Sequence, residues 1–185
     1  MKGTAARMMI VAVVQFGLTS GQTQTNPRPA NVPSDLLATI QSNPAVKECI
    51  QQEHLLPDKI VRTTSFNLNR PQQAVVLVEG LGPCLSGNVN HNIWLYVRAG
   101  NGWRVVLDGI GAKLERISSD AHGWPDLYLW QHDSAFDSVQ VLYRYDGNVY
   151  KPTVCKVVEF ADPLTAGRHA QPASRPCDWD WKARQ

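Results

Sequence analysis

The amino-acid sequence predicts a mainly β protein in which two four-stranded, blade-like repeats pack as a compact β sandwich or open barrel, with one or two short N-terminal helices. Three observations support this fold class. After residue 57, short runs of β-branched and aromatic residues alternate with Gly, Asn, Asp and Pro, as strands and tight turns do. Much of this pattern occurs twice along the chain. Four cysteines, an even number, favour a domain held by two disulfides.

The start of the chain has the three parts of a secretory signal. Lys2 and Arg7 are basic, residues 8–18 are almost wholly apolar, and residues 19–21 are of the small kind that a signal peptidase cuts beside. A membrane-spanning helix needs roughly 20 apolar residues, and this run is about half as long. We therefore predict a signal peptide at 1–21, a periplasmic or secreted protein, and no membrane span in the mature chain.

The next segments predict a linker and then a helical start to one domain. Residues 22–33 are rich in Pro, Thr and Asn, which is typical of a flexible spacer. A single β-rich domain is expected over 34–185, with a helical part at 34–56. Ser34 is predicted to cap one helix, and Asn43 followed by proline is predicted to start a second.

Strands are expected wherever β-branched and aromatic residues run between turn residues. The Gly-Asn-Gly at 100–102 and the Asp-Gly-Asn at 146–148 are typical of hairpin turns that need a positive φ. The predicted strands are 60–66, 74–79, 92–98, 103–108, 113–118, 127–131, 138–145, 149–154 and 156–160.

An internal repeat relates the two halves of this β region. RTTSFNLNRP at 62–71 parallels RISSDAHGWP at 116–125, and each is followed by an apolar strand. A Leu-Tyr strand with a Gly-Asn turn occurs at 95–103 and again at 142–150. The predicted parts of the domain are repeat 1, repeat 2 and a C-terminal tail, at residues 59–110, 111–160 and 161–185.

The second repeat resembles an FG-GAP-type blade, the four-stranded unit of integrin-like propellers. The matching stretch contains Asp120, His122, Pro125 and Asp126 in an acidic, Gly-containing loop ahead of an apolar strand. Ser118 and His122 stand where the calcium-binding form of that loop would have acidic ligands. Because two blades cannot close a propeller of four or more, the resemblance implies that the copies pack on each other. The chain also resembles a widespread group of exported bacterial proteins of uncharacterised activity, which implies export and fold only.

All four cysteines lie in the mature part, and no C-x-x-C pair suggests a zinc ribbon or a thioredoxin-like redox site. We favour a Cys84–Cys155 disulfide, which would tie the two repeats together, and a Cys49–Cys177 disulfide, which would anchor the tail. The alternative, in which each cysteine bonds its neighbour along the chain, stays open at this point.

Charge argues against nucleic acid as a partner. The chain has 18 basic and 16 acidic side chains. Removing Lys2 and Arg7 with the signal leaves 16 of each, so the mature protein is formally neutral. A nucleic-acid-binding protein normally presents a basic surface, and none is indicated here.

Residue types that occur in hydrolases are present, but their pattern is unspecific. His122, Asp126, His132, Asp133 and Ser134 include a possible nucleophile, base and orienting acid. No G-x-S-x-G motif occurs, and a β domain lacks the strand-to-helix turn that exposes such a serine. We therefore predict no catalytic residues.

No metal site and no cofactor are predicted either. Asp120 and Asp126 supply only two carboxylates, whereas calcium prefers six or more oxygen ligands. The histidines at 91, 122 and 132 lack the spacing of a zinc site.

Alternation places Trp94 and Tyr96 on the less apolar face of their strand, because Ile93, Leu95 and Val97 point the other way. These aromatics form either a ligand-binding platform or part of the core. The tentative binding residues are Trp94, Tyr96, Asp120, His122, Asp126 and His132.

The leading functional hypothesis is an exported, non-catalytic binding module for an unknown protein or glycan of the cell envelope. It depends on the lack of a catalytic motif in a disulfide-bonded β domain. The alternative is an inhibitor of an envelope-directed hydrolase, with residues 80–91 as its inhibitory loop. A hydrolase that uses His132 and its neighbours is the third and least favoured hypothesis.

Overall fold

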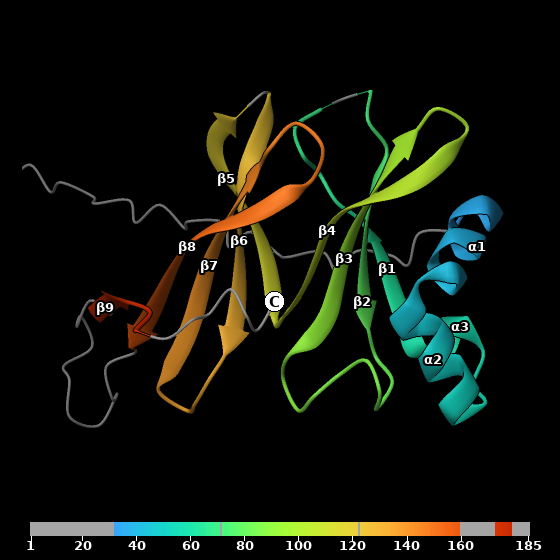
Figure 1. The fold of residues 1–185 in the computed structure, drawn as a ribbon, viewed down its shortest axis with the longest axis horizontal. Coiled ribbons are helices and arrows are strands. Elements are labelled where there is room, and N and C mark those ends of the chain that lie inside the picture. The colour runs from blue at the N-terminus through green and yellow to red at the C-terminus, as the bar shows by residue number, and fades with distance from the viewer. Residues whose placement is uncertain (1–31, 71, 122, 160–172, 179–185) are drawn as a thin grey trace, which may run out of the picture.

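The computed structural model describes residues 32–70, 72–121, 123–159 and 173–178, which form three layers (Figure 1). Three short helices cover one face of a four-stranded sheet, and the other face of that sheet packs on a five-stranded sheet. This arrangement confirms the predicted fold class of two packed antiparallel sheets with few helices. The predicted signal peptide lies outside the described residues.

The helices are short, and their first turns show why they begin where they do. Asn43 accepts a hydrogen bond from the backbone N–H of Ala45 at 3.0 Å and precedes a proline, as predicted. The prediction for Ser34 was wrong, because Ser34 lies inside its helix and caps nothing. Asp35 lies in that first turn instead, where a negative charge is favourable. The helices are α1 (Ser34–Ser42), α2 (Pro44–Glu53) and α3 (Pro57–Ile60).

The first sheet has the strand order β1-β2-β3-β4, so that β4 lies at one edge. Gly100 adopts a φ of 57° in the β3–β4 turn, as its place in a predicted hairpin requires. The predicted strand at 60–66 starts one residue later than expected, because Ile60 ends α3. The strands are β1 (Val61–Ser65), β2 (Val75–Gly80), β3 (His91–Ala99) and β4 (Gly102–Gly111).

The second sheet has the order β5-β6-β7-β8-β9. The two strands predicted at 149–154 and 156–160 are one strand, β8, over their described residues 150–159, because Cys155 continues the pairing with β7 opposite Val141. No strand was predicted in the tail, yet residues 173–176 add a short edge strand to β8. The strands are β5 (Lys113–Ala121), β6 (Trp124–His132), β7 (Asp137–Tyr145), β8 (Tyr150–Glu159) and β9 (Ala173–Pro176).

The repeat is visible in a shared irregularity of the two hairpins. The β3–β4 register shifts between Leu95 and Tyr96, and the β7–β8 register shifts between Leu142 and Tyr143. Each shift leaves one extra residue, a β-bulge, in the second strand of the hairpin. The extra residue is Val106 in β4 and Thr153 in β8. Each position in the first hairpin lies 47 residues before its counterpart in the second, which is also the separation of the two Gly-Asn turns. The two copies therefore match residue by residue here.

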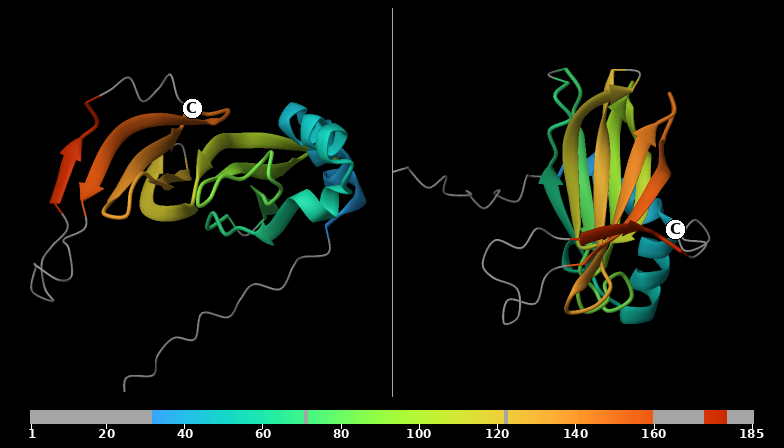
Figure 2. Two further views of the ribbon diagram at one scale, coloured as in Figure 1. Left: turned by 90° about the horizontal axis from the view of Figure 1, so that it is seen from below. Right: turned by 90° about the vertical axis from the view of Figure 1, so that its left-hand side faces the viewer.

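The two copies stack in the same direction. Tyr96 lies on the face that the helices cover, and its counterpart Tyr143 lies on the face of the second sheet that packs on the first. Leu95 lies in the core between the sheets, and its counterpart Leu142 lies on the opposite, outer face. Figure 2 shows the helices at one end of this stack and the second sheet at the other.

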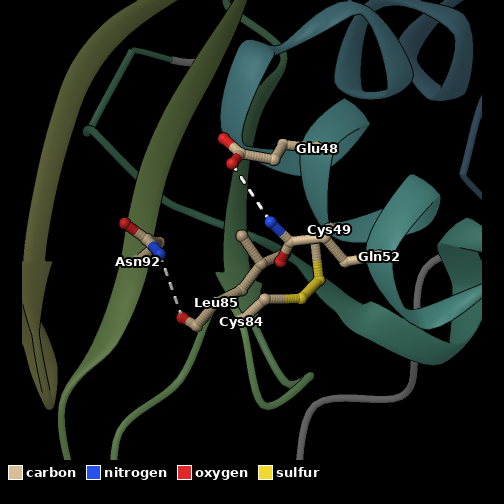
Figure 3. The surroundings of a disulfide bond; sticks show 6 residues. All are labelled: Glu48, Cys49, Gln52, Cys84, Leu85 and Asn92. Carbon is tan, nitrogen blue, oxygen red and sulfur yellow. Dashed lines mark hydrogen bonds between the residues drawn. A yellow bond between two sulfur atoms is a disulfide. The ribbon is translucent and has the colours of Figure 1, made fainter.

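Two disulfides join chain neighbours, which corrects the favoured pairing. Cys49 of α2 bonds Cys84 in the loop after β2, and Cys155 of β8 bonds Cys177 just after β9. Figure 3 shows the first bridge beside Leu85, between α2 and the loop. Cys84 lies in a loop of the first repeat and Cys155 in a strand of the second, and each bonds another cysteine with its Cα at 5.5 Å, so no bridge ties the two copies together.

Candidate functional site

Trp94 and Tyr96 do not form an exposed platform. Their side chains are 1% and 0% exposed, and both pack in the core beneath the helices. Burial of the phenol raises the pKa of Tyr96 to about 12. The helices cover the face that alternation left open, so the alternative interpretation, in which these rings belong to a core, is the one that the structure supports.

The other predicted binding residues are distributed over the second sheet. Asp120 lies in β5, and His122 lies outside the described residues. Asp126 of β6 is 3% exposed, and its Oδ2 accepts a hydrogen bond from Nε of Arg144 at 3.2 Å. His132 is exposed at the end of β6. Asp126 therefore has a structural partner, and no catalytic or metal-binding contact joins it to His132.

The loop proposed for an inhibitor is held against the domain. Leu85 is 2% exposed and its backbone oxygen accepts a hydrogen bond from the side chain of Asn92 (Figure 3). Asn90 bonds both the N–H and the C=O of His132, each at 2.8 Å. The Cys49–Cys84 disulfide holds the first half of this loop as well, whereas residues 87–89 at its tip are exposed.

The neighbours of His132 form a turn. The Ser134 hydroxyl donates to Oδ2 of Asp137 at 3.1 Å and accepts from the backbone N–H groups of Phe136 and Asp137. These contacts use the hydroxyl to close the β6–β7 hairpin. Within the described residues, no group of three or more His, Cys, Asp or Glu side chains is placed to hold a metal ion.

The structure instead presents a cavity of about 550 Å³ beside edge strand β4. This volume lies within the usual range for ligand sites. One wall is residues 105–110 of β4, and the opposite wall is residues 149–152 with Tyr143. Trp94 and Ala45 contribute from the helix side. We call this space the β4 groove.

Two charged side chains reach the β4 groove from opposite walls. Asp108 lies on β4 and Lys151 on β8, and no ion pair joins them. Although much of Asp108 is exposed, neighbouring atoms desolvate its carboxyl group and raise its pKa, against a smaller opposing effect of a hydrogen bond with Trp94. The groove therefore offers a partly desolvated carboxylate that forms no ion pair with any residue the structure describes.

Aromatic side chains form the floor on the side of the second sheet. Burial raises the pKa of Tyr143, and the negative charge of Asp108 acts in the same direction. Tyr150 donates its hydroxyl hydrogen to the backbone oxygen of Pro125 at 2.9 Å. Arg104 of β4 donates to Oη of Tyr145 at 2.8 Å and to the backbone oxygen of Asn148, which joins β4 to the β7–β8 turn next to Val149 of the groove wall.

The backbone of β4 adds hydrogen-bonding groups to this groove. Arg98 of β3 donates its N–H to Ala74 O, away from β4, and Asn92 of β3 donates to Leu85 O. Along a strand of an antiparallel sheet, the backbone groups of successive residues point alternately to one neighbouring strand and to the other. Residues of β3 that bond toward β2 therefore face residues of β4 whose backbone groups point away from β3. By the observed register these residues of β4 are Trp103, Val105, Asp108 and Ile110.

One of these outward residues, Ile110, has a hydrogen-bond partner for its backbone on the side away from β3. The C=O of Ile110 accepts a hydrogen bond from Nε2 of Gln131 at 2.8 Å, which confirms its outward direction. Within the part of the chain that the structure describes, no backbone hydrogen bond links Val105 or Asp108 to a strand on the open side. The groove is thus bordered by unpaired donors and acceptors.

Sequence reasoning missed Asp108 and Lys151. The available signal was an acidic residue within the apolar run Val-Val-Leu-Asp-Gly-Ile at 105–110, which a buried strand would not favour. Among the described residues that line the groove, none is Ser, Thr, Cys or His.

Comparison with other proteins gives no information about function. No family model, no curated protein and no solved structure matches this chain. The resemblance of the second repeat to an FG-GAP-type blade therefore stays a prediction. Across the described residues, none of the helices has the length and apolar character needed to cross a bilayer.

Proposed function

We propose that this chain is an exported, non-catalytic binding module, and that its ligand, a protein or glycan of the cell envelope, binds in the β4 groove. The observation that carries this proposal is the groove itself, which combines a largely apolar lining, the exposed carboxylate of Asp108 and, among the described residues, outward backbone groups of β4 without a strand partner. Such a mixture of apolar surface and a few polar groups is typical of ligand sites.

Export is supported by the two disulfides and by the signal-like start of the chain. Disulfides persist in oxidising compartments such as the periplasm and the exterior, and all four cysteines are bonded. The groove supports the binding role. An inhibitor that uses residues 80–91 is the alternative, since Val89 near the tip of that loop is 42% exposed.

The test is capture of a ligand from an envelope extract with the mature chain and two matched variants. Ile110 is 45% exposed at the rim of the groove, and Phe136 is 55% exposed in the β6–β7 turn, away from it. Ile110→Arg should abolish capture, because it places a charge at the entrance. Phe136→Arg introduces the same charge into another exposed apolar position and should leave capture unchanged.

A photo-crosslinking residue at position 110 should give a covalent product with the captured molecule, and one at position 136 should not. Capture that is equally strong with Ile110→Arg and with the unchanged chain would rule out the β4 groove as the ligand site. Both variants should retain the melting temperature of the unchanged chain, since both positions are exposed.

A further inference from the structure

We infer that the β4 groove binds an extended polypeptide segment, which adds to the first sheet as a strand beside β4. This inference rests on the proposed function and names the class of ligand. Strand addition is a recurring mode of peptide recognition, in which backbone hydrogen bonds supply affinity and alternate side chains supply specificity. The unpaired N–H and C=O groups of Val105 and Asp108 are the receptor groups.

The second copy of the repeat already contains such an added strand. β8 is the counterpart of β4, and the tail strand β9 pairs with it from Lys156 to Glu159. Just beyond β9, Cys177 donates its N–H to the backbone oxygen of Cys155. Cys155 is the counterpart of Asp108, 47 residues earlier, so the outward carbonyl that the tail uses in one copy is open in the other. The residues that β9 pairs with correspond to 109–112, where β6 already supplies hydrogen-bond partners to Ile110 and Ala112, so the open part of the β4 edge ends at Asp108.

A peptide strand fits the polar backbone groups at the edge of β4 better than a small molecule or a glycan does. An edge strand presents donors and acceptors at the spacing of another backbone, and a peptide satisfies them in pairs. The extra residue at the Val106 bulge interrupts this edge. The added strand is therefore short, as β9 is with its four residues.

The side chains of the groove define which peptides fit. On one face of the added strand, a basic residue opposite Asp108 would pair with its carboxylate, which forms no ion pair among the described residues. The next residue points to the other face, toward the wall at residues 149–152, where Val149 and Pro152 are half-buried apolar residues. The preferred segment thus alternates a basic residue with an apolar one.

The experiment selects random dodecapeptides displayed on phage against the oxidised mature chain and measures the affinity of the selected peptides. Val105→Pro removes an outward N–H without removing a hydrogen bond to β3, because that N–H points away from β3. Val105→Ala is the matched control, since it shortens the same side chain and keeps the N–H. We expect binding to fall by about 10-fold or more in the proline variant and by less than about 3-fold in the alanine variant.

A second measurement changes only the peptide and therefore does not depend on the folding of a variant. N-methylation at successive peptide positions should weaken binding at every second residue, because only alternate N–H groups face β4. Asp108→Asn should reduce the selection of Lys and Arg at one peptide position.

Different results would contradict strand addition and the proposed binding function. Equal binding to the proline and alanine variants, no alternation in the N-methyl series, or no selected peptide at all would overturn strand addition. The proposed function would still stand if a captured envelope ligand were lost with Ile110→Arg. If Ile110→Arg retains that ligand, the groove itself is not the site.

Discussion

Asp108 is an acidic side chain in the middle of an apolar strand, and its carboxyl group is desolvated by the walls of the β4 groove. A carboxyl whose pKa is raised on folding binds its proton more tightly in the folded state than in the unfolded state. Folding is therefore penalised once the pH exceeds the ordinary value of 3.8, and the full penalty applies above the raised folded-state pKa.

Replacing Asp108 with Asn should stabilise the protein at neutral pH by removing this penalty. Because Asp108 is partly exposed, we expect a modest rise of roughly 1–3 °C in melting temperature at pH 7. The gain should decrease as the pH falls through the folded-state pKa and vanish below about 3.8. Thermal melting of both proteins between pH 3 and pH 7 measures it.

The matched control is Asp58→Asn, which removes a carboxylate whose side chain is 64% exposed. Its melting temperature should differ little from that of the unchanged chain at every pH. If Asp108→Asn raises the melting temperature as much at pH 3 as at pH 7, the stabilisation does not come from removing a desolvated carboxylate.

Single residues also show what the sequence could and could not predict. Asn43 was identified as a helix cap because its side chain and the following proline act locally. Gly100 and Gly147 were identified as turn residues for the same reason, and both have a positive φ. Trp94 and Tyr96 were placed on the correct face of β3, but which layer covers that face depends on distant helices. Nothing local to the strand contains that information.

At the scale of elements, β8 carries an added strand that is tied to it by the Cys155–Cys177 disulfide. The ion pair between Arg175 and Glu159 joins two half-exposed side chains and contributes little. The four-residue β9 has no buried side chain, so the disulfide is its main anchor. The chain-entropy model gives about 3 kcal/mol for a loop of 22 residues.

The double variant Cys155→Ser with Cys177→Ser should detach β9 and leave the two sheets folded. Hydrogen exchange at the amides of Val157 and Glu159 should accelerate, because these residues face β9 in the alternating ladder. The amides of Val154 and Val158 are the internal control, since they face β7. Uniform acceleration across β8 would instead mean that the disulfide stabilises the whole sheet.

Strands were predicted well where side-chain alternation and turn residues agreed. They were predicted poorly where a contact with a residue distant in the sequence holds the strand in place. Alternation and turns placed β2, β3 and β7 to within a residue or so. β9 has the sequence Ala-Ser-Arg-Pro, which has no strand propensity, and it is a strand because a disulfide and an open edge hold it there. The β4 groove was missed for a related reason, because it lies between two hairpins that are far apart in the sequence.

At the scale of the whole molecule, export is the prediction on which the disulfides and the binding role both depend. Removal of residues 1–21 should give a mature chain that starts near Gln22. The intact mass of protein recovered from the periplasm or the medium checks this. A mass that still includes residues 1–18 would end the argument for a cleaved signal.

The uniform direction of stacking also has a consequence for the molecule's two ends. The helices cover the Tyr96 face of the first sheet, so this end of the stack is closed. Val154 on the outer face of the second sheet is 41% exposed, whereas its counterpart Leu107 is 1% exposed between the sheets. Repeat proteins commonly close one or both ends with a distinct element, and here the helices serve as that element.

The pairing of cysteines in chain order has a consequence for how quickly the protein matures. On the proposed export route the chain emerges from its N-terminus, so Cys49 meets its native partner Cys84 before either later cysteine has appeared. Cys155 and Cys177 then pair in the same way. An oxidant that joins thiols as they emerge makes both native bonds at the first attempt, and the slow reshuffling of wrong disulfides, which takes seconds to hours, is not needed.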